Sequence, residues 1–446
     1  MDNTTLIARA EQAIAAAKIA GADAADALAL VSTDISTSIR HGKPESIEQA
    51  ESCAIGVRVF VGTSSATLST SEFSPEALAN LAANAVAIAR VAPSDPYAGL
   101  ADASLLGHDF TPLDAADDFV PTMKDLQAQA RAAEAAGLAV SGITNSEGGD
   151  ASASRSHVAL VTSHGFAGAY HTARYAISAS LIAGNGEHMQ RDYDYAMTTH
   201  HADLTAAEII GARAASRAVN RLNPRKIASQ QAPVYFEPRA GRQLLSAFAG
   251  AISGSAITRG TSFLKDALGT QIFAKPIRIT DDPRLQRGLA SRAFDAEGIA
   301  AKAMDFVSEG RLTSWVLDAR SARQLGLKTT GHAARGLASS PHPSTSNLYL
   351  HAGSQTPDAL FADIGDGFYV TETIGHGTNL LTGDFSVGAS GFWLEKGHRA
   401  YPVSEVTIAG NLRDMFKQLI AANDLTFTSS TNVPTLAIAH MTIAGS

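Results

Sequence analysis

A glycine-punctuated stretch between Ile374 and Trp393 constrains this chain more than any other segment. Short runs of β-branched and aromatic residues alternate there with glycines at positions 375, 377, 383, 388 and 391, and Gly397 follows just beyond. Glycine at this density weakens regular strands and marks bulges, tight turns or close backbone approach. The stretch also carries the polar residues His376, Asn379, Thr382 and Asp384. The pattern predicts either a binding cleft or a β-meander whose polar residues face water.

Length and charge limit the classes of protein to which the chain can belong. Its 446 residues suffice for two or three domains with sizeable cores. A net charge of −8 argues against a nucleic-acid binder or an anionic-membrane binder. The single cysteine, Cys53, excludes an internal disulfide framework and fits a reducing compartment. No apolar leader follows Asp2 and no run of about 18 apolar residues occurs, so we expect a cytoplasmic protein.

The first half of the chain shows both helical and strand periodicity. Helices are expected at residues 5–19, 74–93, 119–136 and 205–220. Strands are expected at residues 27–33, 35–40 and 54–63, and as two or three antiparallel strands within 141–188. Thr205 and Glu208 have the spacing of a capping box for the last helix, and Pro224 ends it.

The second half reads mainly as short strands separated by Gly, Asp and Pro. Helices are expected only around residues 239–250 and 412–422. The predicted fold class is therefore α+β, with helices and antiparallel strands at the N-terminal side and a mainly antiparallel β domain at the C-terminal side. The expected domains are 1–112, 113–225 and 226–446, the second packing with the first.

The histidines offer few arrangements that would suit a metal ion. Three of them stand seven residues apart in expected strands, at positions 157, 164 and 171. An odd spacing alternates the faces of a strand, so we expect no shared metal centre. His200 and His201, with Asp203, lie in a loop that could hold a metal but is expected to be solvated. His376 is the histidine we place nearest a functional cleft.

Several long phrases of the chain resemble the TldD/PmbA family, once described as modulators of DNA gyrase and now regarded as peptidases. The matching phrases span residues 215–238, 281–298, 314–333, 366–393 and 401–416. They occur in the family's order and cover nearly the whole chain together with a looser match around IGVRVFVG. The sequences of these segments are similar to the PmbA (TldE) branch rather than to TldD.

The resemblance implies that a zinc site of the family is degenerate here. TldD-type chains carry His-Glu-x-x-x-His on a helix and a cysteine near the C-terminus, which together hold and use a zinc ion. In this chain Ser246 and Ala251 stand at the histidine positions and Ala247 at the glutamate position, while Gly250 stands where the family's helix is expected to kink. The C-terminal phrase has no cysteine. We therefore expect no catalytic residue and no metal in this chain, with zinc bound by a TldD-type partner.

The function that the resemblance implies is that of a non-catalytic subunit. TldD–TldE heterodimers cleave small unstructured peptides, so this chain is expected to complete the peptide chamber, and to form a homodimer when the partner is absent. Strands near 366–394 would pair with an extended peptide. His376, Asn379, Thr382 and Asp384 are the expected cleft residues. No direct contact with nucleic acid or membrane is expected.

Two alternatives remain open at this point. One is a metallopeptidase in its own right, using an unrecognised metal site such as His376 with Asp384, or His200 with His201. The other is a non-enzymatic homodimeric regulatory protein that binds another protein.

Overall fold

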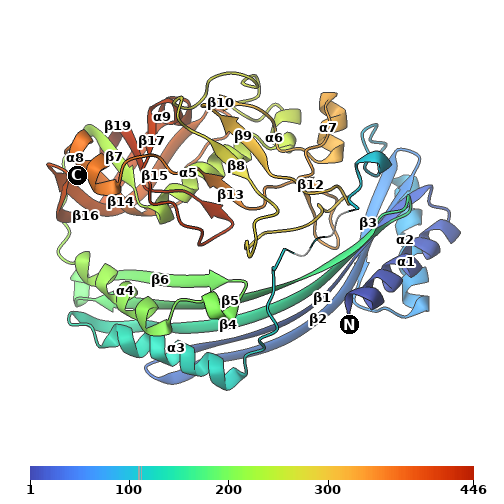
Figure 1. The fold of residues 1–446 in the computed structure, drawn as a ribbon, viewed down its shortest axis with the longest axis horizontal. Helices are drawn as coiled ribbons and strands as arrows, with labels where there is room; N and C mark the ends of the chain where they lie inside the picture. Colours follow the sequence, from blue (N-terminus) through green and yellow to red (C-terminus); the bar gives the residue numbers. More distant parts are fainter. Residues whose placement is uncertain (109–110, 112, 446) are drawn as a thin grey trace.

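A long, curved antiparallel sheet forms the N-terminal half of the molecule (Figure 1). The computed structural model describes residues 1–108, 111 and 113–445. The strand order is β3-β2-β1-β4-β5-β6. The strands are β1 Ala24–Arg40, β2 Lys43–Val61, β3 Ser64–Thr70, β4 Ile143–Thr162, β5 Ala167–Ala183 and β6 Gln190–Thr198. Strand β1 lies between β2 and β4 and is paired with both over most of its length.

Four helices cover the outer, convex face of this sheet (Figure 1). They are α1 Asn3–Ile19, α2 Pro75–Val91, α3 Met123–Leu138 and α4 Ala207–Asn220. Helices α1 and α2 share one core with β1, β2 and β4, and α3 and α4 share another with β1, β4 and β5. Alanine dominates both cores, which lets backbones approach closely. A Cβ atom at Gly211 of α4 would lie 1.8 Å from the carbonyl oxygen of Ala133 in α3, so only glycine fits there.

The C-terminal region lies over the concave face of the N-terminal sheet (Figure 1). Its larger sheet has the order β16-β15-β14-β7-β19-β17, and an additional pairing of β16 with β19 closes a ring. These strands are β7 Gln230–Phe236, β14 Gly367–Ile374, β15 Asp384–Glu395, β16 His398–Asn411, β17 Leu419–Ala421 and β19 Leu436–Ala444.

The remaining C-terminal elements are short. A second sheet has the order β10-β9-β8-β13-β18, and β11 pairs with β12. These strands are β8 Ile279–Asp281, β9 Met304–Ser308, β10 Arg311–Leu312, β11 Ala333–Ala334, β12 His342–Pro343, β13 Leu348–Leu350 and β18 Thr431–Asn432. The helices are α5 Pro238–Ala251, α6 Gly254–Thr258, α7 Ala319–Leu325, α8 Pro357–Ile364 and α9 Leu412–Gln418. Among the described residues, none of these helices combines the length and apolarity of a membrane crossing.

The predicted α+β class is confirmed, while several element boundaries differ from the prediction. The segments 27–33 and 35–40 form one strand, because Asp34 is paired on both sides, with Ala50 and with Ser154. The predicted capping box at the start of α4 is wrong. The helix has Ala206 at its N-cap and no side-chain cap bond.

The extent of the strands and of α9 also differs. Strand β2 begins at Lys43, well before 54–63, because the polar half of this hairpin arm pairs with β1 although its side chains are exposed. The predicted helix 412–422 ends at Gln418, and Leu419–Ala421 pairs with β19 instead.

Pairing between β1 and β4 joins the two predicted N-terminal domains in one sheet. Residue 112, the predicted end of the first domain, lies outside the described residues. The division into 1–112, 113–225 and 226–446 therefore stays a prediction.

A buried ion cluster joins the C-terminal region to the N-terminal sheet. Asp26 of β1 accepts hydrogen bonds from Arg58 of β2, with the Nε contact at 3.0 Å, and from Arg335. The three side chains are at most 7% exposed. Burial alone would raise the pKa of Asp26, but Arg335 and Arg58 outweigh it and hold the pKa below its usual value.

Glu297 lies near this cluster, and its pKa is raised. Its Oε2 accepts a hydrogen bond of 2.7 Å from the backbone N–H of Ala319, and the residue is 3% exposed. Burial, together with the neighbouring Asp295 carboxylate, raises the pKa of Glu297 to about 8. The native protein therefore favours the neutral form of this side chain at neutral pH.

Glu297→Gln should remove a pH-dependent cost to stability. Between the usual glutamate pKa of 4.5 and about 8, the native state binds this proton more tightly than the unfolded state, so wild-type stability falls with rising pH across that window. The variant should gain stability relative to wild type across the window, by no more than about 5 kcal/mol, and the gain should level off above pH 8. Denaturant unfolding from pH 5 to 9 measures this difference. The exposed Glu395→Gln serves as control, and an identical pH slope for wild type and Glu297→Gln would contradict the assignment.

Candidate functional site

One face of helix α5 meets the glycine-rich segment. Gln243, Ser246 and Gly250 are spaced three and four residues apart, so they share this face of the helix. Gln243 Nε2 donates a hydrogen bond of 3.3 Å to the carbonyl of Gly375. A Cβ atom at Gly250 would lie 3.1 Å from Leu380 Cδ1. The segment between Gly375 and Leu380 therefore runs along the helix face that carries Ser246.

The three residues expected at the positions of the two histidines and the glutamate do not converge. Ser246 is exposed, Ala247 is partly buried and Ala251 is 0% exposed. Helix α5 is continuous through Gly250 to Ala251, so the kink expected at Gly250 is not observed. Alanine carries no ligand atom, and residues 246 and 251 are about 140° apart on a regular helix. These side chains do not fit a zinc ion, although the chain's lack of a catalytic metal stays a prediction.

Three of the predicted cleft residues build a tight turn. Asn379 Oδ1 accepts a hydrogen bond of 2.9 Å from the backbone N–H of Leu381, and the Thr382 hydroxyl donates to Asp384 at 2.6 Å. Asn411 Nδ2 donates to the same carboxylate at 3.0 Å. These bonds from Thr382 and Asn411 lower the pKa of Asp384. Asn379, Thr382 and Asp384 therefore hold the turn while remaining exposed.

His376 lies in the same segment and is exposed. Like the three turn residues, it faces solvent rather than the protein interior. Contact of these four residues with a peptide stays a prediction.

The structure places two of the three spaced histidines side by side and the third in a turn. His157 of β4 and His171 of β5 are direct partners across the hairpin, and their rings stack with centroids 5.6 Å apart. His157 and His171 are 14 residues apart, so the alternation expected at each seven-residue step does not separate them. The argument fails at His164, which lies in the turn between the two strands. Burial and the neighbouring His171 lower the pKa of His157. His164 is engaged elsewhere, in the turn, within 2.7 Å of the carbonyl oxygen of Ala101.

The adjacent histidines of the predicted loop point to separate partners. His200 Nε2 lies 3.1 Å from Asp114 Oδ1, and His201 Nε2 lies 2.9 Å from Gln129 Nε2. Across residues 1–108, 111 and 113–445, no group of three or more His, Cys, Asp or Glu side chains is arranged to hold a metal ion.

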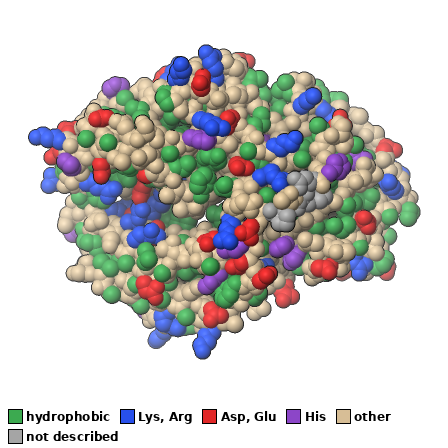
Figure 2. Space-filling model, in the orientation of Figure 1, with side chains coloured by type: hydrophobic (Ala, Val, Ile, Leu, Met, Phe, Trp, Pro, Cys, Tyr) green, Lys and Arg blue, Asp and Glu red, His purple; other side chains and the backbone are tan. Residues whose placement is uncertain are grey.

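Arginines from α4 and α5 form a network that sequence reasoning missed. Asp192 of β6 is 3% exposed and accepts hydrogen bonds from Arg239 at 2.9 Å and from Arg221 at 3.3 Å. Arg217 binds Glu237 through two hydrogen bonds of 3.0 and 2.6 Å. Figure 2 shows this side of the molecule hollowed between the two halves, with Lys and Arg side chains gathered in the hollow. The partners lie far apart along the chain, so no local motif announces them.

Two polar atoms on α5 lack partners within the described part of the chain. Arg242 donates to the hydroxyl of Tyr195 and to that of Thr428, yet its Nε is buried without a hydrogen bond. The Oε1 atom of Gln243 is also buried and unpartnered. Both residues lie within one turn of Ser246, so this part of α5 keeps unused hydrogen-bonding capacity.

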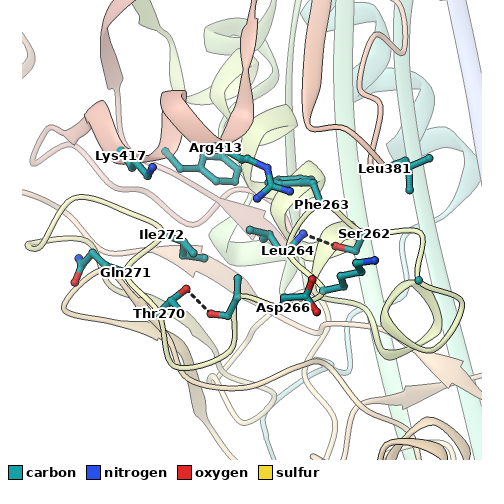
Figure 3. A pocket seen from close by; sticks show the side chains of 14 residues that line it. Ser262, Phe263, Leu264, Asp266, Thr270, Gln271, Ile272, Leu381, Arg413 and Lys417 are labelled. Carbon is teal, nitrogen blue, oxygen red and sulfur yellow. Dashed lines mark hydrogen bonds between the residues drawn. The ribbon is translucent and has the colours of Figure 1, made fainter.

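A pocket of about 340 Å³ adjoins the glycine-rich segment on its other side (Figure 3). Leu381 lies at its edge and Phe263 and Ile272 contribute apolar surface. Its cationic lining residues are Lys265, Arg413 and Lys417. No local pattern predicts this pocket, because its lining residues come from three separate segments, within 260–272, at Leu381 and within 413–417.

Family models match nearly the whole chain in three successive parts. Residues 25–89 match the PmbA/TldA metallopeptidase domain 1, residues 116–222 the central domain and residues 229–445 the C-terminal domain. The chain belongs to the PmbA/TldD metallopeptidase family. Within that family it is similar to a metalloprotease PmbA of Escherichia coli O157:H7, at 36% identity over 425 residues that cover 95% of this chain and 92% of that protein.

Other relatives place the chain in the PmbA (TldE) branch of the PmbA/TldD family. A metalloprotease PmbA homologue of Haemophilus influenzae is 35% identical over 457 residues, covering 100% of this chain and 99% of that protein. A metalloprotease TldD homologue of the same organism is 26% identical over 175 residues, covering only 39% of this chain and 36% of that protein.

Solved structures share this PmbA/TldD fold. A crystal structure of a proposed modulator of DNA gyrase from Bacteroides thetaiotaomicron has a TM-score of 0.91 and 27% identity, covering 98% of both chains. TldE from Thermococcus kodakarensis has a TM-score of 0.88 and covers 98% of this chain and 100% of that chain. At 19% identity, the second likeness shows the fold alone.

Histidine should be tolerated at position 246 but not at position 251. Ala251→His would place a large polar ring in a site that is 0% exposed, which should lower the free energy of unfolding by about 2 kcal/mol or more. Ser246→His, as the exposed control, should change it by about 0.5 kcal/mol or less. Denaturant unfolding of the two variants measures this. Equal stability of the two variants would contradict the orientation of α5.

Proposed function

We propose that this chain is the zinc-free, non-catalytic subunit of a cytoplasmic TldD–TldE-type metalloprotease complex that cleaves small unstructured peptides. The proposal rests on the identity of the residues at three positions of α5. Ser246, Ala247 and Ala251 replace the two histidines and the glutamate that the family's zinc chemistry needs, and Ala251 is buried. A TldD-type partner would supply the metal and the water-activating base.

The free edge of β14 supports a role in holding the peptide. Strand β15 is paired on both sides, but β14 pairs with β7 only over Phe368–Val370. Within the described part of the chain, the end of β14 beyond Val370 therefore has β15 as its one strand neighbour, and its other edge faces side chains of α5. Backbone pairing with an extended peptide needs such an edge.

Helix α5 borders this free edge. Arg239 Nη2 donates to the carbonyl of Thr371 at 3.3 Å, and Gln243 Nε2 donates to that of Gly375 at 3.3 Å. Backbone N–H and C=O groups of successive residues point to opposite edges of a strand, so those of Thr373 face the same edge as the carbonyls of Thr371 and Gly375. A peptide added at Thr373 would lie beside the α5 face that carries Ser246.

Purification from the native host tests the subunit assignment. The tagged chain should co-elute with a near-stoichiometric TldD-type protein bearing His-Glu-x-x-x-His, and zinc should follow that partner. A pure chain with about one zinc of its own would instead support an independent metallopeptidase. A pure chain without partner or metal would support the homodimeric binding protein, and either result would overturn the proposal.

Alanine at both Asn379 and Thr382 should slow peptide cleavage by the assembled complex severalfold. The two side chains hold the turn that follows the free edge, so their loss should loosen the peptide-facing segment. Peptide cleavage and complex assembly are measured together. Asn185→Ala, in an exposed turn of the N-terminal half without a cap bond, is the control. Undiminished cleavage with normal assembly would refute the placement of these residues.

A further inference from the structure

The pocket beside Leu381 combines an apolar floor with a cationic rim (Figure 3). Phe263 and Ile272 are buried in its floor, and Lys265 and Lys417 are exposed at its rim. The guanidinium of Arg413 lies 5.5 Å from the centre of the Phe263 ring, which fits a cation–π contact. The pocket thus offers both apolar contact and positive charge.

The cations of this pocket lack acidic partners in the described part of the chain. No salt bridge is formed there by Lys265, Arg413 or Lys417, whereas the arginines at positions 217, 221 and 239 are each paired with a carboxylate. Asp266 is the one carboxylate among the described lining residues. The pocket is therefore locally positive in a chain whose net charge is −8.

Screening lets this local charge act independently of the overall negative charge. At physiological ionic strength the Debye length is about 8 Å, so distant acidic residues on the surface are largely screened. A group bound inside the pocket would mainly sense the nearby cations. The chemistry favours an anionic ligand that also carries apolar surface.

The size of the pocket favours a short peptide over a folded protein as its ligand. The pocket volume of about 340 Å³ lies at the lower end of the range of about 300–1,000 Å³ that is typical of small-ligand sites. A stable protein partner would need about 800 Å² of surface from this chain, which a single concave pocket does not provide. One or two side chains of an extended peptide fit this space.

The glycine-rich segment connects the pocket to the α5 face. Leu381 lines the pocket and is 59% exposed, while the preceding Leu380 contacts Gly250 of α5. The carbonyl of Leu380 also accepts a hydrogen bond of 2.7 Å from the backbone N–H of Phe263 in the pocket floor. A peptide following this segment would come within reach of both surfaces.

We propose that this pocket binds an acidic residue, with an adjacent apolar side chain, of a short unstructured peptide. The identification of the ligand as a peptide rests on the proposed function. Lys265, Arg413 and Lys417 provide the charge complement, and Phe263 with Leu381 provides the apolar contact. The pocket thereby selects acidic–apolar segments among the peptides that the protein meets.

Binding to the isolated full chain tests the pocket without any partner or cleavage. The probe is a fluorescent eight-residue peptide of alternating Glu and Leu, and its matched control replaces each Glu by Gln. Anisotropy should show binding of the Glu peptide that weakens with added salt, and affinity for the Gln peptide should be at least about tenfold lower. Lys265→Glu combined with Lys417→Glu should lower the affinity for the Glu peptide by about tenfold or more. Both side chains are exposed, so their replacement should not disturb folding.

Controls separate the pocket from general electrostatics. Lys302→Glu, an exposed change of equal charge outside the pocket lining, should leave the affinity within about twofold. Arg413→Gln should weaken binding without reversing a charge. Equal binding of the Glu and Gln peptides, no binding of either, or equal effects of the Lys302 and Lys265/Lys417 changes would overturn the proposal. Displacement by inorganic phosphate at concentrations comparable to the peptide would also overturn it, because the site would then serve free anions.

The experiments distinguish a wrong pocket proposal from a wrong subunit assignment. A chain that co-elutes with a zinc-bearing partner but does not discriminate the two peptides refutes the pocket alone. A chain that prefers the Glu peptide but has no such partner refutes the subunit assignment and retains the pocket.

Discussion

The carboxylate of Asp26 holds the two halves of the molecule together. It lies on β1, in the middle of the long sheet, and receives two guanidinium groups, one from the same sheet and one from the C-terminal region. Breaking a buried pair of this kind typically costs about 3–5 kcal/mol because it leaves an uncompensated buried charge. The backbone of Gly56 in β2 also packs directly against the backbone of Leu337. A Cβ atom at Gly56 would lie 1.8 Å from the carbonyl oxygen of Leu337, so this contact requires glycine. Ion pairing and a bare backbone at Gly56 together determine how the C-terminal region sits on the sheet.

That docking brings α5 and β6 together and so shapes the hollow between the halves. Asp192 of β6 binds Arg239 of α5 and Arg221, which directly follows α4, and this links the N-terminal sheet to the helix at the centre of the candidate site. Helix α5 in turn supports the glycine-rich segment through Gln243 and Gly250. The free end of β14, the α5 face and the cationic pocket are therefore parts of one connected arrangement around a segment rich in glycine.

Local patterns in the sequence predicted much of this architecture. The helical periodicity of α1, α2 and α5 and the Ser74–Pro75 start of α2 agree with the structure, because these elements depend on side chains close together in the chain. The sequence also located the glycine-rich segment, since glycine there permits tight turns and close approach of the backbone to neighbouring groups. The capping box at Thr205 failed because neither partner forms the expected bond. The face alternation expected for the three histidines failed at His164, because this residue lies in a turn and not in a strand.

The sequence by itself determined the α+β class and the membership of the PmbA/TldD family, and it set Ser246, Ala247 and Ala251 in one helix. Each of these follows from residue identity and local spacing. Only the tertiary structure decided that Ala251 is buried, that the pairing of β14 with β7 ends at Val370, and that Lys265, Arg413 and Lys417 share a pocket with Leu381. These features arise from contacts between residues far apart in the chain, and such contacts leave no periodic trace in the order of the amino acids.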